Sequence, residues 1–134
     1  MDKEMNQKYS NVSFPSDIEE MFIDIINKDL VSKKVLNYIT RIRREQKKAV
    51  TIIDIAENLK IERRVGIKNG KTMQYEKRFA AIDRKTVERS VDKLSGMSLI
   101  SYELMKPYKL LSPTLRGAQI VQKLQSRKEV ENNG

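Results

Sequence analysis

The sequence predicts a mainly α fold with a small β component. Three observations lead to this prediction. Apolar residues recur at helical spacing in several stretches, and each stretch begins near a residue that can cap a helix. The pair Asn69-Gly70 lies between two strand-like stretches, which indicates a β-hairpin. The length of 134 residues suits one domain with a single core.

The composition excludes much of the common catalytic chemistry. The chain has no cysteine and no histidine, so it has no disulfide, no cysteine nucleophile, no histidine base and no zinc site built from these residues. We therefore expect a protein that is not an enzyme and holds no cofactor and no metal. Asp54, Glu57 and Asp83 offer oxygen ligands for a divalent cation, but helix capping already accounts for Asp83.

The charge of the chain points to a polyanionic partner. The formal net charge is +9 and the pI is near 9.8, which favours nucleic acid first and an anionic membrane surface second. No apolar run approaches the roughly 18 to 20 residues that span a bilayer, and residues 1–4 are too polar to begin a secretory signal. We expect a cytoplasmic protein without a membrane partner.

The chain divides into an arm, a domain and a tail. Residues 1–15 are polar and predict a flexible N-terminal arm, residues 16–126 a single domain, and residues 127–134 a frayed tail. Ser16 and Glu19 fit a capping box at the start of the first helix. This helix either completes the core or pairs with the same helix of a second copy.

Two further helices follow. Ser32 is a candidate cap for the first of them, which ends in the densest basic run of the chain, from Arg41 to Lys48. Cations in this run either stabilise the helix C-terminus or contact phosphate, and both roles are compatible. Thr51 and Asp54 fit a capping box at the start of the next helix, whose inward face is apolar.

The stretch from Ile61 to Ala81 reads as a hairpin with a net charge of +4. A two-residue loop at Asn69-Gly70 pairs Ile67 with Thr72 and leaves no apolar face. We favour a three-residue loop that pairs Ile67 with Met73, because it gathers the apolar side chains on one side. The positive charge indicates that this hairpin touches DNA as an additional wing, that is, a hairpin that lies against the DNA beside a reading helix. The alternative is a solvated loop.

The next helix has the pattern of a DNA reader. Asp83 is its predicted N-cap, and Val87, Val91 and Leu94 form one apolar face, with Gly96 in the left-handed conformation at its end. The basic side chains lie on the opposite face of the first two turns. The candidate base contacts are Arg84, Lys85, Thr86 and Arg89.

A small hairpin and a last helix complete the chain. Residues 99–104 and 109–112 read as two strands joined by a turn at residues 105–108. Thr114 to Leu124 reads as a helix, which cannot begin earlier because of Pro113. A helix followed by a short linker and a hairpin is the order of a winged helix-turn-helix.

The sequence resembles winged helix-turn-helix proteins, and most closely small bacterial regulators of the multiple-antibiotic-resistance-regulator type. The residues that carry the resemblance are Ile52 to Leu59, Asp83 to Leu94, Gly96 to Ile100 and Thr114 to Gly117. The match covers Thr51 to Leu124. Two features depart from the families: Lys60 to Ala81 separates the two helices of the motif, and the wing turn is unusually short.

The resemblance implies a homodimer that binds specific sites in double-stranded DNA and represses transcription. Winged helices usually dimerise through flanking helices. The predicted dimerisation residues are Ile18, Met21, Phe22, Ile25, Ile26, Val121 and Leu124. Other cations would position the protein on the DNA backbone. These predicted phosphate contacts are Arg43, Arg44, Lys47, Lys48, Arg63, Arg64, Lys68, Lys71 and Lys106.

Two other functions fit the same residues. A plasmid or phage segregation or replication protein would coat repeated DNA sites and hand the complex to a filament or replication factor. A protein-interaction adaptor would use the same fold without DNA, and Glu88 and Asp92 on the basic helix favour it because carboxylates repel phosphates. Glu88 is alternatively an acceptor for a cytosine amino group.

Overall fold

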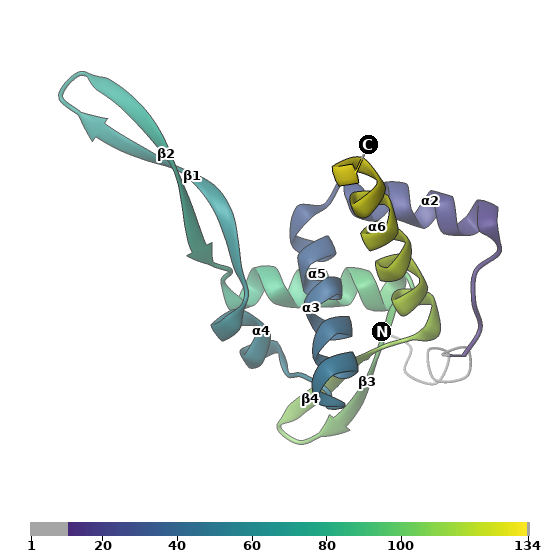
Figure 1. Ribbon diagram of the computed structural model, residues 1–134. Helices are drawn as coiled ribbons and strands as arrows, with labels where there is room; N and C mark the ends of the chain where they lie inside the picture. Colours follow the sequence, from purple (N-terminus) through teal and green to yellow (C-terminus); the bar gives the residue numbers. More distant parts are fainter. Residues whose placement is uncertain (1–10, 134) are drawn as a thin grey trace.

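The described residues form a mixed α/β fold with five helices, a small antiparallel sheet and a separate long hairpin (Figure 1). The computed structural model describes residues 11–133, except for the side chains of Arg63 and of residues 128–133. Residues 1–10 of the arm predicted at residues 1–15 lie outside this range. The helices are α2 (Ser16–Asn27), α3 (Leu30–Gln46), α4 (Ile52–Asn58), α5 (Arg84–Gly96) and α6 (Leu115–Asn133). The strands are β1 (Lys60–Asn69), β2 (Thr72–Ala81), β3 (Ile100–Met105) and β4 (Tyr108–Pro113).

Helix α3 is the centre of the core. It packs against α2, α5, α6 and β4, and its side chains Leu36 and Ile39 are buried. Ile120 from α6 and Leu111 from β4 belong to the same buried cluster. The core therefore holds helices from both ends of the chain around α3.

In the described range no helix is long and apolar enough to cross a membrane.

Two predicted caps are confirmed. The Thr51 hydroxyl accepts a hydrogen bond from Asp54 N at 3.1 Å, and the Asp54 carboxylate accepts one from Thr51 N at 3.0 Å, which completes the capping box of α4. The Asp83 carboxylate accepts from Thr86 N at 2.8 Å at the start of α5. Ile82 just before this cap and Val87 four residues after it are both buried, the spacing of a hydrophobic staple.

Two other cap predictions are wrong. Helix α2 begins at Ser16 itself, with Pro15 as N-cap and no capping side chain, because the Glu19 carboxylate bonds the Gln119 amide instead. Helix α3 is capped by Asp29, whose carboxylate accepts from Ser32 N at 3.1 Å and from the Ser32 hydroxyl at 2.8 Å. Ser32 thus lies inside the helix and donates to the cap.

The end of α5 also differs from the prediction. Gly96 is the last helical residue and does not adopt a positive φ, whereas Ser98 does, at 62°. Leu99 N donates to Leu94 O, and Ser98 N donates to Ser95 O, both at 3.0 Å. This is the hydrogen-bond pattern of a Schellman motif. It buries Leu99 beside Leu94 at the entry to β3.

The small sheet has β3 paired with β4 and one further residue at its edge. Strands β3 and β4 are antiparallel, with Ser101 opposite Ser112 and Met105 opposite Tyr108. Val50 joins the other side of β4 through two hydrogen bonds to Leu111, at 3.1 and 2.7 Å. The loop between α3 and α4 is thereby tied to the sheet.

The start of α6 is packed tightly against the end of α5. Thr114 caps α6 by accepting from Gly117 N at 3.1 Å, and its hydroxyl donates to Ser98 O at 2.8 Å. A Cβ on Gly117 would lie 2.0 Å from the carbonyl oxygen of Leu99. Glycine is therefore required at this position. The apolar pattern predicted an end near Leu124 and a frayed tail from residue 127, but α6 continues to Asn133 because no proline or glycine interrupts it.

Strands β1 and β2 form the predicted hairpin in a register that the sequence did not predict. Asn69 pairs with Thr72 and Ile67 with Gln74, so both registers considered for Ile67 are wrong. The two loop residues are Gly70 and Lys71, and only Gly70 has a positive φ, at 65°. Glycine first in a two-residue loop is typical of a type II′ turn, which matches the twist of the strands.

We predict that Gly117→Ala destabilises the fold by about 1–3 kcal/mol or more, because the new methyl group would overlap the Leu99 carbonyl. Urea unfolding followed by circular dichroism measures the change. The matched control is Gly96→Ala, since a Cβ there meets nothing within 4 Å and alanine favours a helix by up to about 1 kcal/mol. Equal effects of the two substitutions would contradict the close packing of α6 on β3.

We also predict that the Asp29 carboxylate makes stability depend on pH. Partial burial raises the pKa of Asp29, but hydrogen bonds from Lys93 and Ser32 outweigh it, so the pKa lies below its ordinary value of 3.8. The stabilisation is present above pH 3.8 and is lost as the pH falls through the lower folded value. Asp29→Asn keeps a capping side chain but removes the charge, so at neutral pH the variant should have a lower free energy of unfolding than the wild type. This difference should vanish in acid, where the wild-type carboxyl is also uncharged. A deficit that stays constant with pH would contradict this.

Candidate nucleic-acid interface

The rotation of α5 about its axis is fixed by one buried face. Val87, Val91 and Leu94 are fully buried and pack against α3 and α4. The Asp83 cap fixes where the helix begins. At the other end of α5, Lys93 Nζ lies 2.8 Å from the Asp29 carboxylate at the start of α3. The opposite face of α5 must therefore face solvent.

Lys85 and Arg89 lie on that face in the first two turns of α5, and Arg84 lies at its side, toward Val91. Arg84, Lys85 and Arg89 are all exposed, whereas Thr86 is half-buried. Arg84 Nε lies 3.3 Å from the Glu88 carboxylate one turn along the helix. Both side chains of this pair are largely solvated, so the pair contributes little stability and does not hold Arg84 in one place. Three of the predicted base-contact residues are thus exposed at the start of α5, with Lys85 and Arg89 on one side and Arg84 on another, and Thr86 is partly covered.

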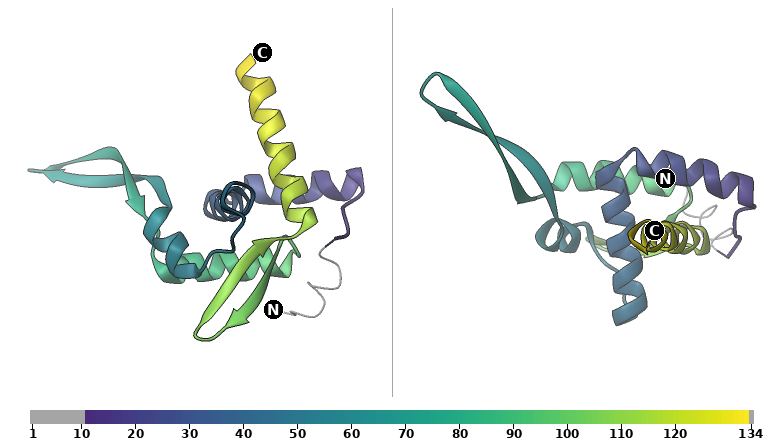
Figure 2. Two further views of the ribbon diagram at one scale, coloured as in Figure 1. Left: turned by 60° about the horizontal axis from the view of Figure 1, so that its bottom comes forward. Right: turned by 45° about the horizontal axis from the view of Figure 1, so that its top comes forward.

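A hollow of about 570 Å³ lies between α5, the start of α4 and the β3–β4 turn. The left view of Figure 2 shows this turn beside α5, on the far side of the molecule from the end of α6. The residues that line the hollow are Thr51, Ile52, Ile53, Arg84, Glu88, Val91, Asp92, Pro107, Tyr108 and Lys109. Residues of α5 and of the β3–β4 hairpin thus line one shared hollow.

The hollow carries charges of both signs. Arg84 and Lys109 bring cations to it, and Glu88 and Asp92 bring carboxylates. Lys109 Nζ lies 5.1 Å from the centre of the Tyr102 ring, a cation–π distance. The wall of the hollow is therefore mixed in charge, whereas Lys85 and Arg89 are exposed on α5 outside it.

The long hairpin lies between α4 and α5 in the sequence, but the two helices still pack against each other in space. Strand β1 begins two residues after Asn58, the last residue of α4, and β2 ends two residues before Asp83. Ile61 and Ile82 are buried at the base of the hairpin, and α4 and α5 pack against each other. The insertion of Lys60 to Ala81 is therefore added to the pair of helices without displacing it.

The other predicted phosphate contacts lie in three places. Arg43, Arg44, Lys47 and Lys48 are exposed at the end of α3, where Lys47 adopts a left-handed conformation just before the sheet edge. Lys106 is exposed in the β3–β4 turn, close to the hollow. The remaining four predicted contacts are in the long hairpin: Arg63, Arg64, Lys68 and Lys71.

The tip of the long hairpin is far from α5. Its two strands have ten residues each, which corresponds to a reach of about 30 Å. Arg64, Lys68 and Lys71 are exposed, with Lys71 in the turn at the far end. The side chain of Arg63 lies outside the described part of the structure. The hairpin projects away from the helical body (Figure 1), so its tip is not part of the surface formed by α5 and the hollow.

The predicted dimerisation residues divide into three groups. Met21 and Ile25 are exposed on α2, whereas Ile26 and Val121 are buried in the core of the single chain. The remaining residues are half-buried: Ile18, Phe22 and Leu124. The Phe22 ring stacks on Phe14 with centres 4.5 Å apart. Only the exposed pair is directly available to another molecule.

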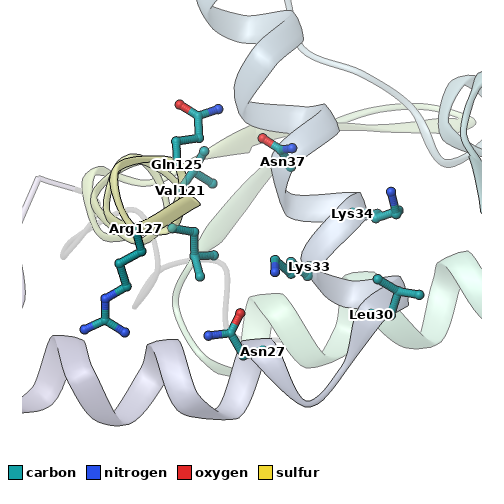
Figure 3. A pocket seen from close by; sticks show the side chains of 9 residues that line it. Asn27, Leu30, Lys33, Lys34, Asn37, Val121, Gln125 and Arg127 are labelled. Carbon is teal, nitrogen blue, oxygen red and sulfur yellow. The ribbon is translucent and has the colours of Figure 1, made fainter. Parts of the chain in front are cut away.

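A second groove of about 480 Å³ lies between α3, α6 and the end of α2 (Figure 3). Its wall combines cations, amides and apolar groups. The lining residues are Asn27, Leu30, Lys33, Lys34, Asn37, Val121, Leu124, Gln125 and Arg127. Arg127 also forms an ion pair with Glu20 of α2, which ties α6 to α2.

Sequence patterns did not reveal the contribution of Ile53 or Lys109 to the hollow, because the hollow exists only once α4 and the β3–β4 turn meet.

In the described part of the chain no three acidic side chains gather to hold a metal ion. Comparison with protein-family models, curated proteins and solved structures finds no match for this chain.

Proposed function

We propose that this protein binds double-stranded DNA at selected sequences through a winged helix-turn-helix. The observation that carries the proposal is the exposed basic start of α5, where Lys85 and Arg89 lie opposite the buried apolar face and Arg84 lies beside it. A helix with its side chains is about 10–12 Å across, and the major groove of DNA is about 12 Å wide. Arginine or lysine to guanine is the commonest specific contact there.

The order of elements supports this proposal. Helices α3, α4 and α5 are followed by the β3–β4 hairpin and then by α6, which resembles the order in winged helix proteins. Val50 adds a third strand position between α3 and α4. In this proposal α5 reads bases, the β3–β4 turn with Lys106 lies against the adjacent backbone, and the cations that end α3 contact phosphates.

Transcriptional repression and DNA segregation or replication both require this interface. They differ in the arrangement of sites. A repressor that is a symmetric homodimer covers one palindrome with half-sites about one helical turn apart. A segregation or replication protein covers an array of repeats and then meets a filament or replication factor. A footprint on DNA that flanks the gene therefore separates the two.

The alternative from another class is an adaptor that binds protein through the same surface. The observation that favours it is the pair of carboxylates, Glu88 and Asp92, in the wall of the hollow. These groups would repel a DNA backbone that entered it. They lie further along α5 than Lys85, so the basic start of the helix remains available to DNA.

We predict that Lys85→Ala or Arg89→Ala weakens binding to the preferred DNA site by about 1–3 kcal/mol, roughly a 5- to 150-fold loss. The preferred site is first selected from a pool of random duplexes. The loss of affinity for random duplex should be smaller, because there the substitution removes only one charge that attracts the phosphates. Fluorescence anisotropy at a fixed salt concentration measures both affinities.

Lys123→Ala is the matched control, since it removes one exposed cation from α6 and leaves α5 intact. It should change neither affinity by more than about twofold. Equal losses for Lys85→Ala on the preferred and the random duplex would show that α5 does not read bases. Absence of any DNA binding at low salt would favour the adaptor.

A further inference from the structure

One face of the long hairpin carries an uncovered line of apolar side chains. Met73, Tyr75 and Phe79 of β2 are 53%, 65% and 72% exposed. Alternate residues of a strand share a face, so all three lie on the same side. Across the strand, Tyr75 pairs with Gly66, and Met73 Sδ lies 3.2 Å from the position of a Cβ on that glycine. Gly66 thus leaves room for the two side chains beside it.

Basic side chains run beside this apolar line. Lys68 pairs with Met73, and Arg64 pairs with Lys77, which places all three cations on the same face. Lys77 lies 3.9 Å from Glu62. Arg64 and Lys68 form no ion pair within the described residues. On this face β2 therefore carries Met73, Tyr75 and Phe79 with Lys77 among them, and β1 carries the cations Arg64 and Lys68, with Glu62 at the base opposite Phe79.

Helix α2 combines exposed apolar side chains with negative charges, whereas the hairpin face combines them with positive charges. Met21 and Ile25, one turn apart, are 50% and 38% exposed. Asp17, Glu20 and Asp24 follow the helical spacing along the adjacent side and are also exposed. The helix Ser16–Asn27 contains four acidic residues and no basic one, and Arg127 pairs with only one of the three exposed carboxylates.

We propose that the hairpin of one copy binds α2 of a second copy. The stretch from Met73 to Phe79 spans about 20 Å, close to the roughly 18 Å length of the twelve-residue α2, and Met21 and Ile25 occupy about 6 Å of that length. Met73, Tyr75 and Phe79 pack on Met21 and Ile25, and the cations beside them face the carboxylates of α2. Both uncovered apolar lines are buried in this contact.

The contact joins copies head to tail. The hairpin and α2 lie at opposite ends of the molecule in every view (Figures 1 and 2), so one chain cannot close the contact on itself. A contact between two different surfaces repeats from copy to copy and gives a ring or an open chain. Such an assembly matches directly repeated DNA sites better than a single palindrome.

Other partners satisfy fewer of these features. Pairing α2 with the same helix of another copy would bring carboxylates against carboxylates, and pairing two hairpins would bring cations together. Duplex DNA would neutralise Arg64 and Lys68 but would leave Met21 and Ile25 uncovered. A second copy supplies both carboxylates for the hairpin cations and exposed apolar side chains for Met73, Tyr75 and Phe79.

The test is sedimentation velocity of the full chain without DNA, over a range of concentrations at low and high salt. The hairpin variant is Tyr75→Asp with Phe79→Asp, and the helix variant is Met21→Lys with Ile25→Lys. Gln74→Asp is the control for the hairpin, because Gln74 is exposed on the other face of β2. Asn27→Lys is the control for α2. Unchanged thermal unfolding verifies that each variant is folded.

We expect the wild-type chain and both controls to grow beyond two protomers with concentration, and salt to weaken this growth. Each variant alone should stay monomeric. Mixing the two variants should give a 1:1 complex of two protomers that grows no further, because one intact hairpin meets one intact α2. That mixture is the decisive observation, since a folding defect would not be rescued by mixing.

Three results would overturn the proposal. A stable dimer of the hairpin variant alone would show that α2 pairs with α2. A dimer of the helix variant alone would show that hairpins pair. A wild-type chain that stays monomeric, with DNA binding lost in the hairpin variant, would assign the face to DNA. Because the association is measured without DNA, its failure leaves the proposed role of α5 untouched.

Discussion

The rest of the structure depends on the burial of one face of α5. Val87, Val91 and Leu94 fill the space between α3 and α4, so the helix cannot rotate without exposing them. The cap at Asp83 and the ion pair from Lys93 to Asp29 fix its two ends. Lys85 and Arg89 are exposed as a consequence of this packing. Burial on one side thus determines which chemistry the protein offers on the other.

The long hairpin is tolerated because it is anchored only at its base. Ile61 and Ile82 are buried there, beside α4 and α5, while most of the strand residues beyond them are exposed. An isolated two-stranded hairpin is marginally stable in water. A ribbon of this length that leaves Tyr75 and Phe79 in solvent therefore has a physical reason to contact a partner.

Features set by neighbouring residues were predictable from the sequence. The capping box of Thr51 and Asp54, the cap at Asp83 and the apolar face of α5 are local patterns, and each is present. The existence of two hairpins was also predictable. What the sequence could not give is how α4 and the β3–β4 turn meet, so it did not place Ile53 and Lys109 together.

Two of the wrong predictions reflect contacts distant in the chain, whereas the hairpin register is set locally by its turn. Glu19 would complete a capping box with Ser16, but it bonds Gln119 on α6. Gly96 was the obvious left-handed residue, yet Ser98 takes that role because Leu99 has to be buried at the start of β3. The hairpin register follows from the turn at Gly70 and not from the gathering of apolar side chains.

We propose that α5 and the β3–β4 turn form the DNA-binding surface, and changes in backbone amide chemical shifts on titration with duplex DNA test this directly. We expect the largest changes at residues 84–89 and at Lys106, Tyr108 and Lys109, with small changes in α2 and at the hairpin tip. Changes confined to residues 64–77, with α5 unaffected, would contradict it.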